Sequence, residues 1–159
     1  MCGAISKDDV LERVETRRVF VRNDGVAPRV LLVDDSDVNL LMLKTILGKM
    51  CHFDLITATN GREALDSLNA HIAKGQPVDA VITDVWMPEM TGDELVGCLR
   101  GDARFAKLPI YAVTTDREVC ENYARMGFDG CCLKPYAAED LRMLMTGEGV
   151  EGSRARLAM

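Results

Sequence analysis

Short apolar runs alternate with stretches of helical periodicity between residues 29 and 146. We expect strands at residues 30–33, 53–57, 80–83, 110–113 and 131–133. Several of these runs are almost uninterrupted in apolar character, which is typical of strands buried on both faces of a sheet. Strands that alternate with helices favour a parallel sheet, because each connection crosses back over one face. The pattern therefore predicts an α/β domain with a doubly wound sheet.

Five apolar stripes follow the five predicted strands, with residues three or four positions apart, as on one face of a helix. The stripes consist of Leu40, Leu43, Leu47 and Met50; Ala64, Leu65, Leu68 and Ile72; Leu95, Val96 and Leu99; Val119, Tyr123 and Met126; and Leu141, Leu144 and Met145. Three helix starts are predicted from a capping residue followed three positions later by Glu. The side chain of each residue in such a pair can accept the backbone N–H of the other. These pairs are Asn60 with Glu63, Thr91 with Glu94, and Thr115 with Glu118.

The two ends of the chain do not continue this repeat. Residues 1–28 are charged and weakly amphipathic, with a turn at residues 23–25 and a break at Pro28. We interpret them as an arm or linker; a partner-binding helix and a dimer contact are the alternatives. Residues 147–159 are expected to form a flexible tail, which leaves one domain at residues 29–146.

Composition and charge narrow the classes of function. The net charge is −6 and the pI is near 4.9, which argues against a nucleic-acid surface built from clustered Lys and Arg. There is no apolar run of the ~20 residues that cross a bilayer, and the first residues lack the apolar stretch of a secretory signal. We therefore expect a soluble, cytoplasmic protein without direct membrane insertion.

The cysteines show no metal-binding spacing. The six are Cys2, Cys51, Cys98, Cys120, Cys131 and Cys132. None forms a C-x-x-C pair, and only His52 and His71 could assist them in binding zinc. We expect free thiols that mainly pack in the core, with a redox role for the adjacent Cys131 and Cys132 as the alternative.

Polar residues follow four of the five predicted strands. They are Asp34 and Asp35, Asp84, Thr114 and Thr115, and Lys134 with Pro135. Ligands of open α/β sheets bind beyond the carboxyl ends of the strands, so these residues are expected to meet at one edge. Three converging carboxylates repel one another, which requires a counter-charge from Lys134 and a cation. Oxygen ligands favour Mg2+ over zinc. Asp37 is interpreted as a cap or a surface acid at the start of the first helix.

The motifs RVLLVDDSDVN, ITDVWMPEMTG, LPIYAVTT and CLKP resemble those of response-regulator receiver domains over residues 29–146. The segment DDSDVNLLMLKTIL is particularly similar to receivers of hybrid histidine kinases. The resemblance implies a flavodoxin-like fold with five helices and strand order 2-1-3-4-5. It also implies that Asp84 is the phosphoacceptor, that Asp34, Asp35, Asp84 and the Trp86 carbonyl bind Mg2+, and that Thr114 and Lys134 hold the phosphoryl oxygens. Such a domain catalyses its own aspartyl phosphorylation and slow hydrolysis, and is not expected to be a turnover enzyme.

Two features depart from the family pattern. Cys131, three residues before Lys134, stands where receivers have the aromatic residue that couples phosphorylation to their output surface. The segment between Thr114 and Lys134 is about two residues shorter than usual, with Thr115 in place of a small Ala, so the following helix is expected to start early. By the same resemblance, Trp86 and Asp116 border the path of attacking water, and we hypothesise that Trp86 slows hydrolysis.

Two other functions stay open. One is a pseudo-receiver that binds partners without being phosphorylated. The other is a haloacid-dehalogenase-type phosphatase with Asp35 as nucleophile, since residues 35–37 form a D-x-D motif after an apolar strand. Against the phosphatase, the Gly-Thr that follows the second Asp in that family is missing, and so is its cap domain. This function would also leave the D-x-x-M-P-x-M-x-G motif from Asp84 to Gly92 unexplained.

The receiver resemblance implies protein partners. Neither His52 nor His71 lies in a sequence that suggests a phosphohistidine donor. The phosphodonor is therefore expected to be another protein, a sensor histidine kinase or a histidine phosphotransfer protein. It is expected to dock beside the first helix, near Leu40 and Leu41. Output would pass to a downstream protein, and a homodimer through the arm or the fourth helix is possible.

Overall fold

The computed structural model describes residues 24–147, in which five strands alternate with five helices. The strands are β1 (Arg29–Val33), β2 (Asp54–Ala58), β3 (Ala80–Asp84), β4 (Ile110–Thr114) and β5 (Gly130–Leu133). The helices are α2 (Asp37–Met50), α3 (Gly61–Ala73), α4 (Gly92–Arg100), α5 (Arg117–Met126) and α6 (Ala138–Thr146).

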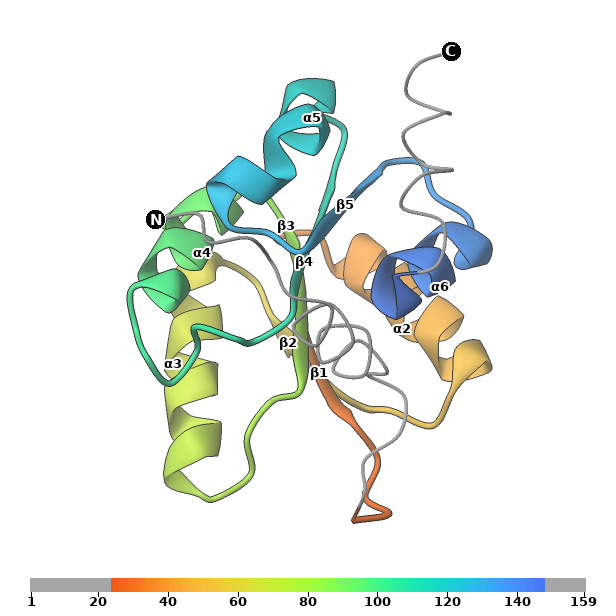
Figure 1. Cartoon of the computed structure of the whole chain (residues 1–159). Helices are drawn as coiled ribbons and strands as arrows, with labels where there is room; N and C mark the ends of the chain where they lie inside the picture. The colour runs from red at the N-terminus through yellow and green to blue at the C-terminus, as the bar shows by residue number, and fades with distance from the viewer. Residues whose placement is uncertain (1–23, 148–159) are drawn as a thin grey trace, which may run out of the picture.

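All five strands are parallel and form one sheet in the order β2-β1-β3-β4-β5 (Figure 1). The predicted fold class, strand order and element count are therefore confirmed for the described residues. Four strands are one residue longer than predicted. The edge strand β2 begins and ends one residue later, at Asp54 and Ala58.

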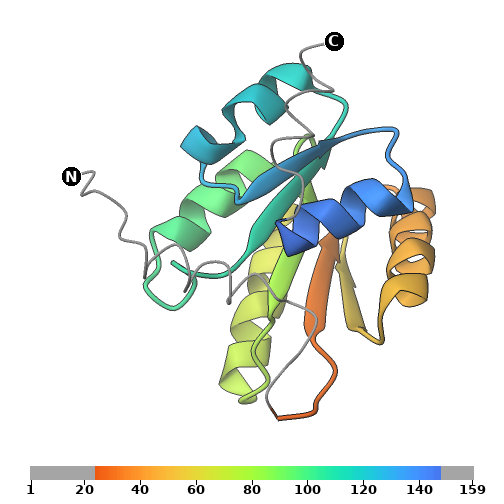
Figure 2. The same cartoon turned by 45° about the vertical axis from the view of Figure 1, so that its right-hand side comes forward.

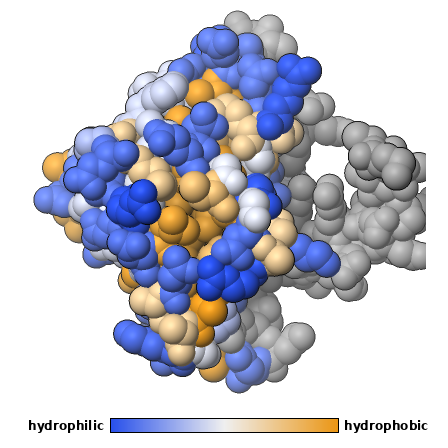
Figure 3. Space-filling view, turned by 90° about the vertical axis from the view of Figure 1, so that its left-hand side faces the viewer, coloured by the Kyte–Doolittle hydropathy of each residue, from blue (hydrophilic) through white to orange (hydrophobic). Residues whose placement is uncertain are grey.

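Helices cover both faces of the sheet, as Figures 1 and 2 show. Side chains of a strand alternate between the faces, so Leu31 and Val33 of β1 pack toward α3, α4 and α5. Val30 and Leu32 pack on the other face with α2 and α6. The surface on the α3, α4 and α5 side has an apolar centre with hydrophilic side chains around it (Figure 3).

The capping predictions hold for two of three helices. Asn60 accepts the Glu63 N–H at the start of α3, and Thr91 with Glu94 forms a reciprocal capping box at α4. The prediction for Thr115 is wrong: Asp116 caps α5, and its Oδ1 accepts the N–H groups of Glu118 and Val119. Because the cap lies one residue later, α5 starts at Arg117.

The prediction of free thiols is wrong for two cysteines. Cys120 of α5 and Cys131 of β5 form a disulfide, because α5 packs on β5 and brings their Cα atoms to 5.2 Å. Sequence spacing alone does not show this packing. Cys98 and Cys132 are free, and Cys2 lies outside the described residues.

Most of the two predicted flanking segments also lies outside the described residues, so the arm, the tail and the possible dimer contact remain predictions. No helix between residues 24 and 147 is long and apolar enough to cross a membrane.

Candidate functional site

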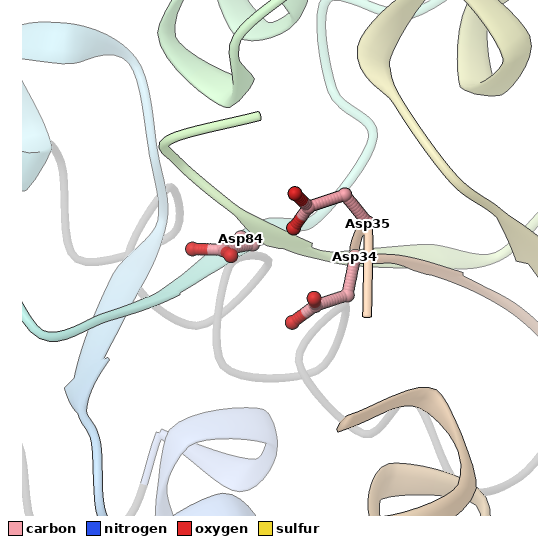
Figure 4. A group of neighbouring side chains, drawn as sticks. All are labelled: Asp34, Asp35 and Asp84. Carbon is pink, nitrogen blue, oxygen red and sulfur yellow. The ribbon is translucent and has the colours of Figure 1, made fainter. Parts of the chain in front are cut away.

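Three carboxylates meet at the carboxyl edge of the sheet. Asp34 and Asp35 follow β1, and Asp84 is the last residue of β3. One carboxylate oxygen from each lies within 4.8 Å of the others (Figure 4). The strand register explains this meeting, because Val33 pairs with Thr83 and the next residues of both strands are the acids. The cluster predicted from the sequence is therefore present.

Asp34 is the most tightly held of the three acids, with a side chain only 1% exposed. Its Oδ1 accepts the Ser36 N–H at 2.9 Å, and the Asn39 amide donates to both of its oxygens at 3.3 Å. Ser36 also caps α2 by accepting the Asn39 N–H. The start of α2 thus fixes this carboxylate, a role for Ser36 and Asn39 that we did not predict. Asp37 is exposed in the first helical turn, which fits its interpretation as a surface acid.

Lys134 supplies the positive charge in this cluster. Its Nζ lies 3.1 Å from Asp34 Oδ2 and 3.3 Å from Asp84 Oδ2, and the side chain is mostly buried. The Lys134 backbone N–H donates to the Thr114 carbonyl at 2.8 Å, which continues the β4–β5 ladder, and a cis peptide bond joins Lys134 to Pro135. The Lys134 ammonium, which we predicted as a counter-charge, therefore forms ion pairs with Asp34 and Asp84.

Burial raises the pKa of Asp84 above its usual value of 3.8. The nearby Lys134 charge opposes this shift, while the Asp34 charge adds to it. The Val85 N–H donates to Asp84 Oδ1 at 2.8 Å and stabilises the ionised form. Burial of the Asp84 carboxylate thus outweighs the stabilisation of its ionised form by Lys134 and the Val85 N–H.

Gly92 allows α4 to begin directly against the end of β3. Its N–H donates to the Val85 carbonyl at 2.7 Å, and a Cβ at this position would lie 2.3 Å from the Asp84 carbonyl oxygen. Just before it, Glu89 has a positive φ of 64°. The sequence showed Gly92 within a motif, but only the structure shows why a side chain cannot fit there.

Thr114 and Trp86 both contact the residue that caps α5. The Thr114 hydroxyl accepts the Asp116 N–H at 3.1 Å. The Trp86 indole N–H donates to Asp116 Oδ2 at 3.1 Å, although the Trp86 side chain is largely exposed. Thr114 lies one residue beyond Val113, the register partner of Asp84, so its hydroxyl is at the same edge as the acids.

Neither histidine lies in the acidic cluster. His52 is exposed before β2, and the His71 Nδ1 donates to the Ser67 carbonyl within α3. The cluster therefore offers only oxygen ligands among the described residues. Such a donor set fits a hard cation such as Mg2+ better than zinc.

The sequence model of the response regulator receiver domain matches residues 30–146. The chain belongs to this family. A chemotaxis protein CheY homolog of Campylobacter jejuni is 34% identical over 128 residues, covering 76% of this chain and 95% of the relative. The receiver family acts in two-component signal transduction, and neither the pseudo-receiver nor the phosphatase alternative is favoured.

Solved receiver structures share the fold. The chemotaxis response regulator CheY4 of Vibrio cholerae is 30% identical with a TM-score of 0.62, covering 83% of this chain and 99% of that chain. The receiver domain of the sensor histidine kinase PA1611 from Pseudomonas aeruginosa is 22% identical with a TM-score of 0.66, covering 77% of this chain and 97% of that chain. That structure holds a magnesium ion in its active-site cleft.

Proposed function

We propose that Asp84 accepts a phosphoryl group from a phosphohistidine and carries it as an aspartyl phosphate. The observation that carries this proposal is the position of Lys134, whose ammonium lies between Asp34 and Asp84. Asp34 is buried and accepts bonds from three other residues, which leaves no room for a phosphoryl group on its carboxylate. Asp84 is more open, with its side chain 13% exposed. Among the three acids, it combines a neighbouring cation with room for a phosphoryl group.

The reaction would form one bond and break one bond. An Asp84 carboxylate oxygen attacks the phosphorus, the P–N bond to the donor imidazole breaks, and its electron pair stays on the imidazole nitrogen. Lys134 is positioned to hold a phosphoryl oxygen, and the Thr114 hydroxyl can turn from Asp116 to donate to another. The same groups would later support slow hydrolysis. The domain would thus act on its own carboxylate and not as a turnover enzyme.

We infer that Mg2+ binds Asp34, Asp35 and Asp84, with the Trp86 backbone carbonyl as a further ligand. The three carboxylate oxygens are close enough to share one ion. When bound, Mg2+ would neutralise the negative charge that builds up on the phosphoryl oxygens. The magnesium ion in the active-site cleft of the P. aeruginosa receiver domain supports this inference.

The donor is proposed to be a sensor histidine kinase or histidine phosphotransfer protein that docks on α2, and a further protein would receive the output. Leu41 and Val38 are 65% and 75% exposed and offer an apolar contact beside the acids. The prediction that Leu40 joins this surface is wrong, because Leu40 is only 6% exposed and packs against the sheet. We propose that residues 29–146 form the domain that accepts the phosphoryl group, and that the transfer takes place in the cytoplasm.

Intact-protein mass tests the proposed acceptor. The protein is incubated with Mg2+ and either acetyl phosphate or phosphoramidate, which has a P–N bond like that of phosphohistidine. We expect a gain of one phosphoryl group that disappears with EDTA and in Asp84→Asn. Asp37→Asn is the matched control and should keep the gain, because Asp37 lies outside the cluster. No gain from either donor would contradict the proposal and favour a pseudo-receiver.

The fluorescence of Trp86, the only tryptophan, provides a separate test of the metal. We expect Mg2+ to change its emission, because Trp86 lies two residues from Asp84. Asp35→Asn should weaken Mg2+ affinity by at least about tenfold, since even losses outside the ligand shell cost 10- to 100-fold. Asp37→Asn should leave the titration unchanged. Equal affinities in all three proteins would contradict the assigned ligands.

A further inference from the structure

The Cys120–Cys131 disulfide joins α5 to β5. The two residues are 11 positions apart, and the bond closes a loop that contains most of α5. Two other described cysteines, Cys98 and Cys132, are free, and Cys98 is exposed. A disulfide framework of a secreted domain usually pairs its exposed cysteines. One bond among free thiols instead fits a pair that is oxidised and reduced during function.

Strand alternation separates Cys131 from its neighbour. Cys131 packs toward the α5 side of the sheet, whereas Cys132 is buried on the opposite face with α2 and α6. Burial raises the pKa of Cys132 to about 12, so it stays a protonated, unreactive thiol. Oxidation is therefore directed to Cys120 and Cys131. Cys131 keeps partial exposure while Cys120 is 4% exposed, so an external thiol or disulfide reaches Cys131 first.

Few apolar contacts hold α5 in place. Only Val119 and Cys120 are buried among its ten residues, and Tyr123 and Met126 are partly buried. A helix with so little buried surface opens locally at low cost. A covalent link from one of its two buried residues to the central part of β5 therefore changes the stability of the helix substantially.

The linked elements both reach the acidic site. Cys120 lies four residues after Asp116, which contacts Thr114 and Trp86. Cys131 lies three residues before Lys134, which contacts Asp34 and Asp84. The Cys120–Cys131 bond consequently fixes the first turns of α5 relative to β5, the strand that Lys134 directly follows.

We propose that Cys120 and Cys131 are a reversible redox modification site, oxidised by low-molecular-weight disulfides such as glutathione disulfide, whose disulfide form holds α5 against β5. The Cys131 thiolate attacks one sulfur of the oxidant and releases one thiol. The Cys120 thiolate then attacks the Cys131 sulfur, forms the protein disulfide and releases the second thiol. Two electrons pass from the protein to the oxidant, and the two protein protons end on the released thiols.

Thiol alkylation and mass spectrometry test the chemistry on the full chain without any phosphodonor. When the protein is unfolded in denaturant for alkylation, we expect six alkylated cysteines after reduced glutathione and four after glutathione disulfide, with the Cys120 and Cys131 peptides linked. Reduction should restore all six. Cys120→Ser and Cys131→Ser should each abolish the internal link, and Cys132→Ser should leave it intact. A link through Cys132, or no internal link at any glutathione ratio, would overturn the proposal.

Amide hydrogen exchange tests the structural effect. We expect the amides of α5 to exchange at least about tenfold more slowly in the disulfide form, because the bond limits the open states of a short loop. Exchange in α3 should not change. The Cys120→Ser protein should show the same α5 exchange in both glutathione conditions. Equal α5 exchange in the oxidised and reduced wild-type protein would overturn the proposed restraint, whatever happens at Asp84.

Discussion

The Trp86 indole N–H donates a 3.1 Å hydrogen bond to Oδ2 of Asp116, the residue that caps α5. The two residues belong to different loops, one after β3 and one after β4. Asp116 Oδ1 accepts two backbone N–H groups of α5. The backbone N–H of Asp116 donates to the Thr114 hydroxyl. The bond holds an exposed indole two residues from Asp84, and we hypothesise that this indole shields Asp84 from attacking water.

Removal of the indole is expected to speed loss of the phosphoryl group. Trp86→Ala should shorten the half-life of phosphorylated Asp84 by roughly 2- to 10-fold, equivalent to about 0.4–1.4 kcal/mol in the barrier. Trp86→Phe keeps most of the bulk without the N–H and separates shielding from the hydrogen bond. Half-lives are measured by intact mass after removal of the donor. An unchanged half-life in Trp86→Ala would show that the indole does not shield the site.

Two glycines of α4 should respond oppositely to alanine. Gly92→Ala places a methyl group 2.3 Å from the Asp84 carbonyl oxygen, and we expect a loss of about 1–3 kcal/mol in the free energy of unfolding. Gly97 is exposed, and a Cβ there would have no neighbouring atom within 4 Å, so Gly97→Ala should raise stability by up to about 1 kcal/mol. Urea denaturation measures both. A Gly92→Ala protein as stable as the wild type would refute the close approach.

Arg100 joins α4 to two loops. Its guanidinium donates to the carbonyls of Gly127, Phe105, Ala106 and Leu108 and pairs with Asp129. Arg100→Ala leaves partly buried acceptors without a donor, so we expect a loss of about 2–4 kcal/mol in unfolding free energy. Arg104→Ala is the matched control and should cost far less than Arg100→Ala, because its ion pair with Asp102 is exposed. Similar losses in both variants would argue against this role of Arg100.

The fold was largely predictable because its strands are buried on both faces. Runs such as residues 80–83 and 110–113 carry the pattern directly, and strand ends were predicted to within one residue. The cap of α5 was missed because Thr115 and Asp116 are both good capping residues. Only the backbone path shows that the Asp116 carboxylate reaches the helical N–H groups.

The candidate site was predictable where it follows strand ends, as for Asp34, Asp84 and Lys134. The contacts that support the site were not predicted. Asn39 reaches Asp34 through the first turn of α2, and the Cys120–Cys131 bond depends on how α5 lies on β5. Neither contact has a local sequence pattern.

The raised pKa of Cys132 predicts slow alkylation. At pH 9.0, a thiol with its usual pKa of 9.0 is half ionised, whereas a pKa of about 12 leaves on the order of one thiolate in a thousand. Iodoacetamide should therefore modify the exposed Cys98 at least about 100-fold faster than Cys132 in the folded protein. The same shift means that unfolding releases the Cys132 proton above pH 9, so stability should fall as the pH rises from 9 toward 12. Equal alkylation rates would contradict the burial of Cys132.

The location of the phosphoryl group tests the central claim most directly. After reaction with acetyl phosphate and Mg2+, borohydride reduces an aspartyl phosphate to homoserine, and tandem mass spectrometry of the peptides identifies the converted residue. The account predicts homoserine at position 84 and at neither position 34 nor position 35. Conversion at position 35 would contradict the account and support the phosphatase alternative, and a phosphorylated protein without homoserine would show that no aspartate is the acceptor.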